Sequence, residues 1–131
     1  MTRINSGIPT AELVDMHLLA EHREIKRIPN CIKSGRYSLE NMPSTFRMGT
    51  GHVKFFYDKL QYLHNRYLDI YAECVSRGFN VTDYSECFSD LPAELYNDYT
   101  PTDTDRMLIR ERIALRLKEY NEKQLNKWKT L

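Results

Sequence analysis

The sequence predicts an all-α fold, a compact single domain of three main helices joined by long irregular loops. Apolar residues recur at steps of three and four in three long segments, which is the spacing of a helix face, while the alternation typical of strands is weak throughout. No repeat, low-complexity tract or linker interrupts the chain. Its 131 residues are 41% hydrophobic, so one domain spanning residues 1–131 can bury a core without metals or disulfides.

The first helix is expected to run from Thr10, which can cap a helix, to about Arg27, with Pro29 ending it. Its stripe mixes apolar and ionisable side chains: Leu13, Met16, His17, Ala20 and Glu24. A folded-back N-terminus is expected near the ionisable pair on that stripe. Residues 30–51, rich in Ser, Gly, Asn and Pro, are expected to form a long loop of the kind that often has a functional role.

A long second helix is expected from His52 to Arg77, with Gly78 as its stop. Its predicted buried stripe is Val53, Phe56, Tyr57, Leu60, Leu63, Tyr67, Ile70 and Cys74. An acidic, irregular stretch follows over residues 79–99. Pro101 and Asp103 then mark the start of a third helix, whose stripe comprises Ile109, Ile113, Leu117 and Tyr120.

The extreme N-terminus, read together with Glu24, offers a specific chemistry. A residue as small as Thr2 permits removal of Met1, which leaves an α-amine with a pKa of about 7.7 to 8.0. A fraction of that amine is neutral near pH 7 and can form a Schiff base if a carboxylate moves protons and stabilises positive charge. On these residues alone, an ordinary N-terminus and a solvated surface glutamate are the favoured interpretation.

Charge is unevenly distributed although the net charge is only +1. Residues 82–105 contain seven acidic side chains and no Lys or Arg. Two basic clusters lie elsewhere: Arg23, Lys26, Arg27, Lys33 and Arg36, and Arg106, Arg110, Arg112, Arg116 and Lys118. Both can face a phosphate backbone, but charged runs are more often solvated helix faces, so nucleic acid is one option among others.

Several classes of protein are disfavoured by what the sequence lacks. The three cysteines, Cys31, Cys74 and Cys87, are far apart and odd in number, so neither a disulfide framework nor a metal site is indicated. The four histidines form no recognisable ligand set. No membrane span or signal peptide is evident, and a cytoplasmic location is predicted.

In combination, several blocks of sequence resemble the pyrimidine-dimer DNA glycosylase/AP lyase family of the bacteriophage endonuclease V type. The resemblance extends to about Lys118. The blocks are Met1–Asn5; His17-Leu18; Arg23-Glu24 on to Arg27; Ser44-Thr45-Phe46; Gly49–Leu60; Ala72-Glu73-Cys74; Arg77–Asn80; Ser89–Pro92; Asp98-Tyr99; and Pro101.

The resemblance implies a helical DNA repair enzyme that excises cyclobutane pyrimidine dimers and then cuts the backbone. Thr2 would supply the amine, which attacks C1′ of the 5′ nucleotide, displaces the base and leaves an imine that undergoes β-elimination. Glu24 would stabilise the cationic sugar and move the 2′ proton. The same resemblance implies no metal or organic cofactor, and a monomer acting on double-stranded DNA with dimers or abasic sites in a bacterial or phage-infected cell.

Six further residues match family positions that line the site or contact DNA. They are Arg3, His17, Arg23, Arg27, Arg112 and Arg116. The aromatic C-terminal tail of the family is reduced here to Trp128, and the loop after Arg27 is shorter and less basic. Two alternatives therefore stay open: an AP lyase or glycosylase for another lesion, and a DNA-binding relative without catalysis.

Overall fold

The computed structural model describes residues 2–129, with side chains described as far as Lys127. This part of the chain forms α-helices and short 3-10 turns and no strand, which confirms the predicted all-α class. The α-helices are α1 (Asp15–Glu24), α2 (Arg27–Ser34), α3 (His52–Phe55), α4 (Leu60–Ser76) and α5 (Asp103–Lys129), and the 3-10 turns are η1 (Thr10–Glu12), η2 (Ser85–Phe88) and η3 (Ala93–Leu95). None of these helices is both long and apolar enough to cross a membrane.

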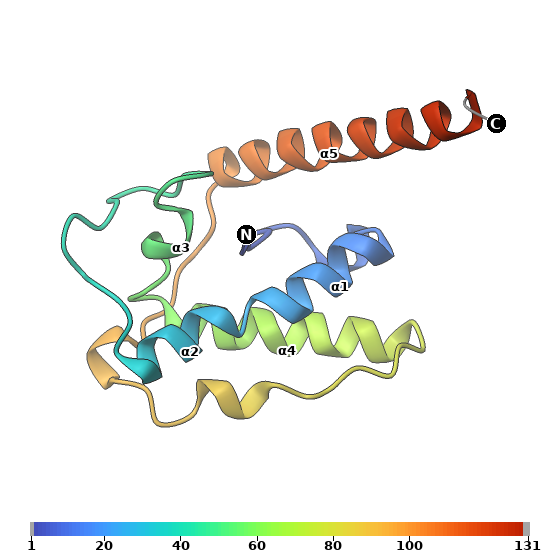
Figure 1. Ribbon diagram of the computed structural model, residues 1–131. Helices are drawn as coiled ribbons and strands as arrows, with labels where there is room; N and C mark the ends of the chain where they lie inside the picture. Colours follow the sequence, from blue (N-terminus) through green and yellow to red (C-terminus); the bar gives the residue numbers. More distant parts are fainter. Residues whose placement is uncertain (1, 130–131) are drawn as a thin grey trace.

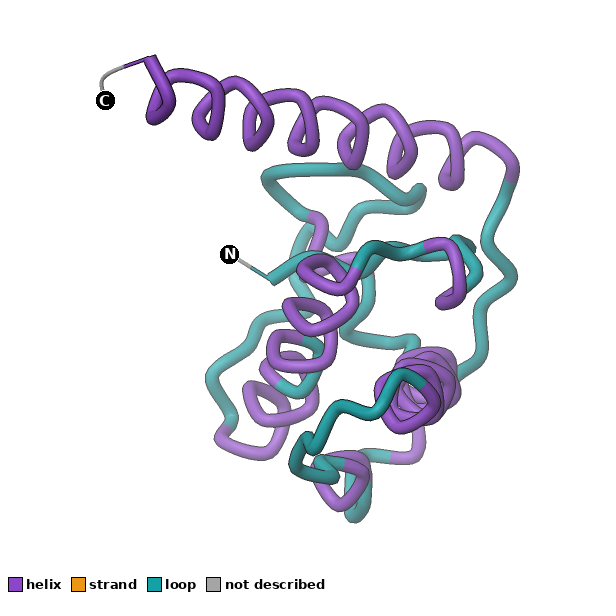
Figure 2. The backbone as a smooth tube through the Cα atoms, turned by 90° about the vertical axis from the view of Figure 1, so that its right-hand side faces the viewer, coloured by secondary structure: helices purple, strands orange, loops and turns teal. Residues whose placement is uncertain are grey.

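Helix α4 is central to the core, with α1 packed along it (Figure 1), and α2 packs against η2. Helix α5 lies apart from α4, and the N-terminal segment runs between α1 and α5. Figure 2 shows the same arrangement from the side, with α5 above the N-terminal segment and the 36–51 loop. The fully buried side chains at the centre include Ile4, Leu18, Ile25, Leu63 and Tyr67.

The predicted first helix is divided into three pieces. Thr10 does not cap it, because this residue lies in η1. Leu13, which follows η1, has an extended backbone and a side chain buried in the core, and α1 begins only at Asp15. Pro29 does not end the helical segment either. Proline has no N–H to donate to the Ile25 carbonyl, so α1 ends at Glu24, and a new helix accommodates Pro29 in its first turn, where that N–H needs no partner.

The predicted helix from His52 to Arg77 is also broken. Phe55 and Phe56 are both buried, and adjacent residues on one straight helix cannot both face a narrow stripe. A turn over residues 56–59 resolves this conflict, and the Lys59 ammonium donates to the Phe55 carbonyl (2.9 Å) where α3 ends. Beyond the break the prediction is confirmed, because the predicted stripe residues from Leu60 onward are fully buried and Gly78 ends the helix with a φ of +85°.

Helix α5 begins where the sequence predicts. Thr102 and Asp105 form a reciprocal cap, in which the Thr102 hydroxyl accepts the Asp105 N–H (3.1 Å) and the Asp105 carboxylate accepts the Thr102 N–H (3.1 Å). Of its predicted stripe only Ile109 is fully buried, and Tyr120 is 45% exposed. The C-terminal end of α5 extends past the rest of the protein (Figures 1 and 2). The side chain of Trp128 lies outside the described residues.

Candidate active site

The N-terminal segment is fixed in place by hydrogen bonds from consecutive residues. The Arg3 N–H donates to Glu24 Oε1 (3.2 Å), and the Ile4 N–H donates to His52 Nε2 (2.9 Å). The Asn5 side-chain amide donates to Glu21 Oε1 (2.8 Å). The segment is extended and has no backbone partner strand, so side chains from α1 and α3 provide its hydrogen bonds.

A buried ion pair lies beneath these contacts. Arg66, from α4, donates to both carboxylate oxygens of Glu21 at 2.8 and 3.0 Å and to the Ile8 carbonyl at 2.6 Å. The side chains are 7% and 0% exposed. Burial acts to lower the pKa of Arg66, but the charge and hydrogen bonds of Glu21 raise it above its usual range. The pair therefore joins α1, α4 and residues 5–8 through charged hydrogen bonds.

Glu24 occupies the last position of α1, one turn from Glu21 and on the side nearer to the N-terminus. Its side chain is 15% exposed, and the Arg23 guanidinium approaches its second oxygen to 3.7 Å. Glu24 Oε1 thus accepts the Arg3 N–H, the backbone group next to Thr2, while Oε2 faces the Arg23 guanidinium. The carboxylate remains accessible to a ligand.

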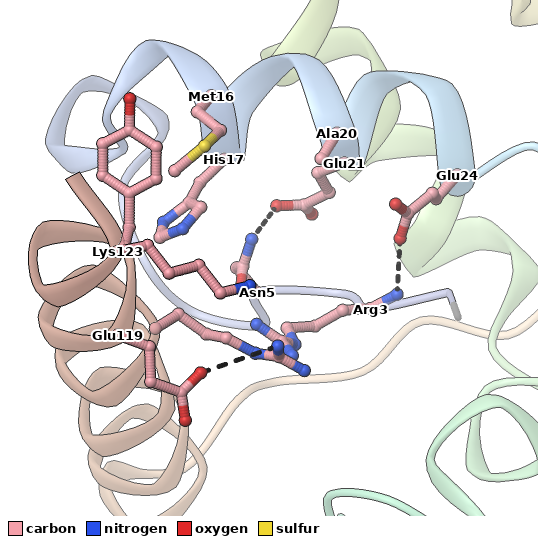
Figure 3. Close-up of a pocket in the computed structure, with 11 residues that line it drawn as sticks. Arg3, Asn5, Met16, His17, Ala20, Glu21, Glu24, Glu119 and Lys123 are labelled. Carbon is pink, nitrogen blue, oxygen red and sulfur yellow. Dashed lines mark hydrogen bonds and ion pairs between the residues drawn. The ribbon is translucent and has the colours of Figure 1, made fainter. Parts of the chain in front are cut away.

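A cleft of about 380 Å³ opens between α1 and α5 (Figure 3). Its α1 wall ends at Glu24, and its α5 wall carries Glu119 and Lys123. The complete lining is Arg3, Asn5, Met16, His17, Ala20, Glu21, Glu24, Arg116, Glu119, Tyr120 and Lys123. Three cations and an exposed aromatic ring make this cleft suited to a ligand with both negative charge and flat apolar faces.

A second hollow of about 330 Å³ adjoins the first and contains the predicted nucleophile. Its lining is Thr2, Arg3, Met48, Gly49, His52 and Arg112. Thr2 and Glu24 therefore line different hollows, and Arg3 lines both. A group that touches both predicted catalytic residues must sit at the junction beside Arg3.

The cations around this junction affect one another. Burial, followed by the charges of Arg112 and Arg116, lowers the pKa of Arg3, although Glu24 opposes this shift. Burial and the same kind of repulsion, here from Arg3 and Arg116, lower the pKa of His17. Two buried polar atoms of the cleft, Asn5 Oδ1 and His17 Nδ1, have no hydrogen-bond partner. Positive charge is thus concentrated around the junction, although Arg116 pairs with Glu119 (3.9 Å) and Arg23 with Glu24 (3.7 Å). Burial and these cations keep His17 neutral near pH 7.

The predicted site residues are only partly brought together. Arg3, His17 and Arg116 line the cleft with Glu24, and Arg112 lines the hollow with Thr2. Arg23 is 61% exposed beside Glu24, and Arg27 is exposed at the start of α2.

The first basic cluster of the sequence does not form one surface. The Lys26 ammonium lies 3.6 Å from the centre of the Tyr84 ring, and Lys33 donates to the Glu86 carbonyl (3.1 Å). Both therefore pack against the acidic segment rather than the cleft.

Sequence reasoning missed two features of the site, the Glu21–Arg66 pair and the role of His52. A signal for the pair was present, since Arg66 lies three residues after Leu63 and four before Ile70 on the predicted buried stripe. An arginine at such a position needs a buried acidic partner. For His52 we find no comparable signal.

A basic cleft beside an anchored N-terminal segment, on a small helical protein, is typical of proteins that bind an anionic polymer. The sequence model of the pyrimidine dimer DNA glycosylase family matches residues 1–86, and the chain belongs to that family. Family membership implies a DNA repair glycosylase that acts on damaged DNA. The match covers the N-terminal segment and α1 to α4 but not α5, which carries Arg112 and Arg116.

Within residues 2–129, no group of three or more His, Cys, Asp or Glu side chains is arranged to hold a metal ion.

Proposed function

We propose that this protein is a bifunctional DNA N-glycosylase and AP lyase for cyclobutane pyrimidine dimers, with the amine of Thr2 as nucleophile after Met1 is removed. The amine lone pair attacks C1′ of the 5′ nucleotide of the dimer, and the glycosidic bond breaks with its electrons going to the base. The attached nitrogen gives up a proton, which the departing base can take, and its lone pair then forms a protonated imine with C1′ as the C1′–O4′ bond breaks and O4′ takes up a proton, which opens the sugar ring. Removal of a 2′ proton expels the 3′ phosphate by β-elimination.

One observation carries this proposal, the hydrogen bond from the Arg3 N–H to Glu24 Oε1 at 3.2 Å. Neighbouring residues of a chain span at most about 3.6 Å, so the Thr2 nitrogen lies within roughly 7 Å of that oxygen. A sugar ring placed between them can contact both. Glu24 would stabilise the cationic sugar during base loss and accept the 2′ proton during elimination.

The cations around the junction would hold the DNA. We assign phosphate contacts to Arg3, Arg23, Arg27, Arg112 and Arg116, and a position beside the lesion to His17. A lesion within a duplex is accessible only if the DNA bends and a nucleotide leaves the stack, and cations on both sides of the cleft can hold that distorted backbone. Because a dimer already weakens stacking, damaged DNA would cost less to deform.

The variant Glu24→Gln tests the catalytic assignment, with Glu119→Gln as a matched control. Both changes replace a carboxylate of the same cleft by an amide, but only Glu24 binds the backbone next to Thr2. We expect Glu24→Gln to bind a dimer duplex as tightly as the wild type while losing strand cleavage, and Glu119→Gln to retain both. Equal loss of binding and cleavage in Glu24→Gln, or full cleavage by it, would contradict the assignment.

A further inference from the structure

His52 is the buried residue through which α3 holds the N-terminal segment. The residue is only 4% exposed. Its ring is fixed by edge-to-face contacts with Phe46 and Phe56, at centroid distances of 5.4 and 5.5 Å. Such contacts leave the imidazole little freedom to rotate. The ring lines the same hollow as Thr2.

The two ring nitrogens have partners that specify one protonation state. The Arg47 carbonyl, 2.9 Å from Nδ1, can only accept, so Nδ1 carries the hydrogen. The Ile4 N–H, 2.9 Å from Nε2, can only donate, so Nε2 presents its lone pair. His52 is therefore neutral, with the hydrogen on Nδ1, and it connects the 36–51 loop to the backbone two residues after Thr2.

We propose that His52 is a positioning residue for the N-terminal nucleophile: through the Ile4 N–H it fixes the path of residues 2–4, and so the distance from the Thr2 amine to Glu24. This inference rests on the proposed function, because it concerns the placing of that amine. The Arg3 N–H and the Ile4 N–H bind opposite walls of the site, Glu24 on α1 and His52 on α3. Loss of either contact lets the terminal residues rotate away from the junction of the two hollows.

Protonation of His52 would undo this arrangement, because Nε2–H would point at the Ile4 N–H. The charged groups facing the ring are Arg3 from the N-terminal segment, Glu21 from α1 and Arg112 from α5. Burial is the largest influence and lowers the pKa of His52, with Arg3 acting in the same direction, while the Arg47 carbonyl and Glu21 oppose it. The neutral form, and with it the anchor, is retained at neutral pH.

Two substitutions separate the two hydrogen bonds of the ring. In His52→Gln, the side-chain oxygen can reach the place of Nε2 and accept the Ile4 N–H without titrating. In His52→Asn, the shorter amide can donate to the Arg47 carbonyl but leaves the Ile4 N–H without an acceptor. His22→Gln is the control, since His22 is equally buried (4%) and hydrogen-bonded through Nε2 to Tyr67 (3.1 Å), but does not contact the N-terminal segment.

Single-turnover cleavage of a dimer duplex and its dissociation constant are measured for each variant. We expect His52→Asn to cleave about 10- to 100-fold more slowly, the usual effect of misplacing a reacting group, with DNA affinity unchanged. His52→Gln and His22→Gln should cleave at nearly the wild-type rate. If His52→Asn cleaves normally, or if its loss appears in affinity or equally in His22→Gln, the proposal is wrong.

Hydrogen exchange of the Ile4 amide tests the anchor in the unmodified protein. We expect a protection factor that is high at pH 7 and falls as His52 becomes protonated, with no such fall in His52→Gln. An Ile4 amide that exchanges freely at pH 7 would overturn the inference whatever the cleavage rates. If the wild type fails to cleave dimer DNA while Ile4 is protected, the proposed function has failed and the anchor has not.

Discussion

Replacement of Arg66 by methionine should destabilise the protein strongly. Methionine keeps most of the apolar stem of Arg66, so the change chiefly removes two hydrogen bonds to Glu21 and one to the Ile8 carbonyl. Glu21 would remain a fully buried carboxylate with only the Asn5 amide as partner. Leaving one member of a buried ion pair unpaired costs about 3 to 5 kcal/mol, a large fraction of a typical stability of about 5 to 15 kcal/mol.

Urea denaturation followed by far-UV circular dichroism measures this loss. With a slope of about 2 kcal/mol per molar, the midpoint of Arg66→Met should fall by about 2 M. Arg110→Met is the matched control, because Arg110 pairs with Glu12 (3.2 Å) where both side chains are half exposed, and such pairs contribute about 0 to 1 kcal/mol. A loss below about 1 kcal/mol in Arg66→Met would refute the reasoning that Glu21 is charged and dependent on Arg66.

Three further predictions concern pH, DNA affinity and the backbone. The pKa values of His17, His22 and His52 are all lowered, mainly by burial. As the pH falls through about 6.5, the unfolded chain therefore takes up protons that the folded protein does not. The free energy of unfolding should be largest above that pH and should decrease below it. Urea midpoints at pH 7.5 and 5.5 check this, and a midpoint that rises at pH 5.5 contradicts it. Arg112→Ala and Arg116→Ala should each weaken binding to damaged and undamaged duplexes alike and reduce the slope of log affinity against log salt by about 1, as titrations at several salt concentrations would show; an unchanged slope would remove that arginine from the DNA interface. Gly7→Ala should lower the thermal midpoint more than Gly49→Ala. Both glycines have positive φ (+81° and +68°), but only at Gly7 would a Cβ lie 2.8 Å from carbon atoms of Arg106 and Pro101. Equal shifts of the midpoint in the two variants would contradict the steric argument.

Helix periodicity and glycine positions in the sequence predicted those parts of the fold that are determined by residues close together in the chain. The stripe of α4 and the stop at Gly78 follow from helix periodicity and from the freedom of glycine at positive φ. The break between α3 and α4 could not be predicted in this way, because it depends on the core accepting both Phe55 and Phe56. At Pro29 the sequence signal was local but was interpreted as the end of a helix, whereas proline also fits the first turn of a new one, α2.

For the site, the sequence predicted that a folded-back N-terminus would lie near His17 and Glu24, which share one stripe of the first predicted helix. It did not predict which face of α1 is buried. The core side chains of α1 are Leu18, Glu21 and His22, while Leu13 of the predicted stripe enters the core ahead of α1. The other members of that stripe line the cleft: Met16, His17, Ala20 and Glu24. The hydrogen bond from the Ile4 N–H to His52 joins residues 48 positions apart, so only the tertiary structure reveals it.

Borohydride trapping shows whether the Thr2 amine forms an imine with damaged DNA. The protein, with removal of Met1 verified by intact mass, is incubated with duplexes carrying a cyclobutane thymine dimer, an abasic site or no lesion, and any imine is reduced to a stable adduct. We expect a covalent adduct on the dimer duplex that maps to Thr2, and none on undamaged DNA. Trapping on the abasic duplex alone would leave a lyase or a glycosylase for another lesion, and an absence of adducts on both damaged duplexes would rule out the imine chemistry proposed for Thr2.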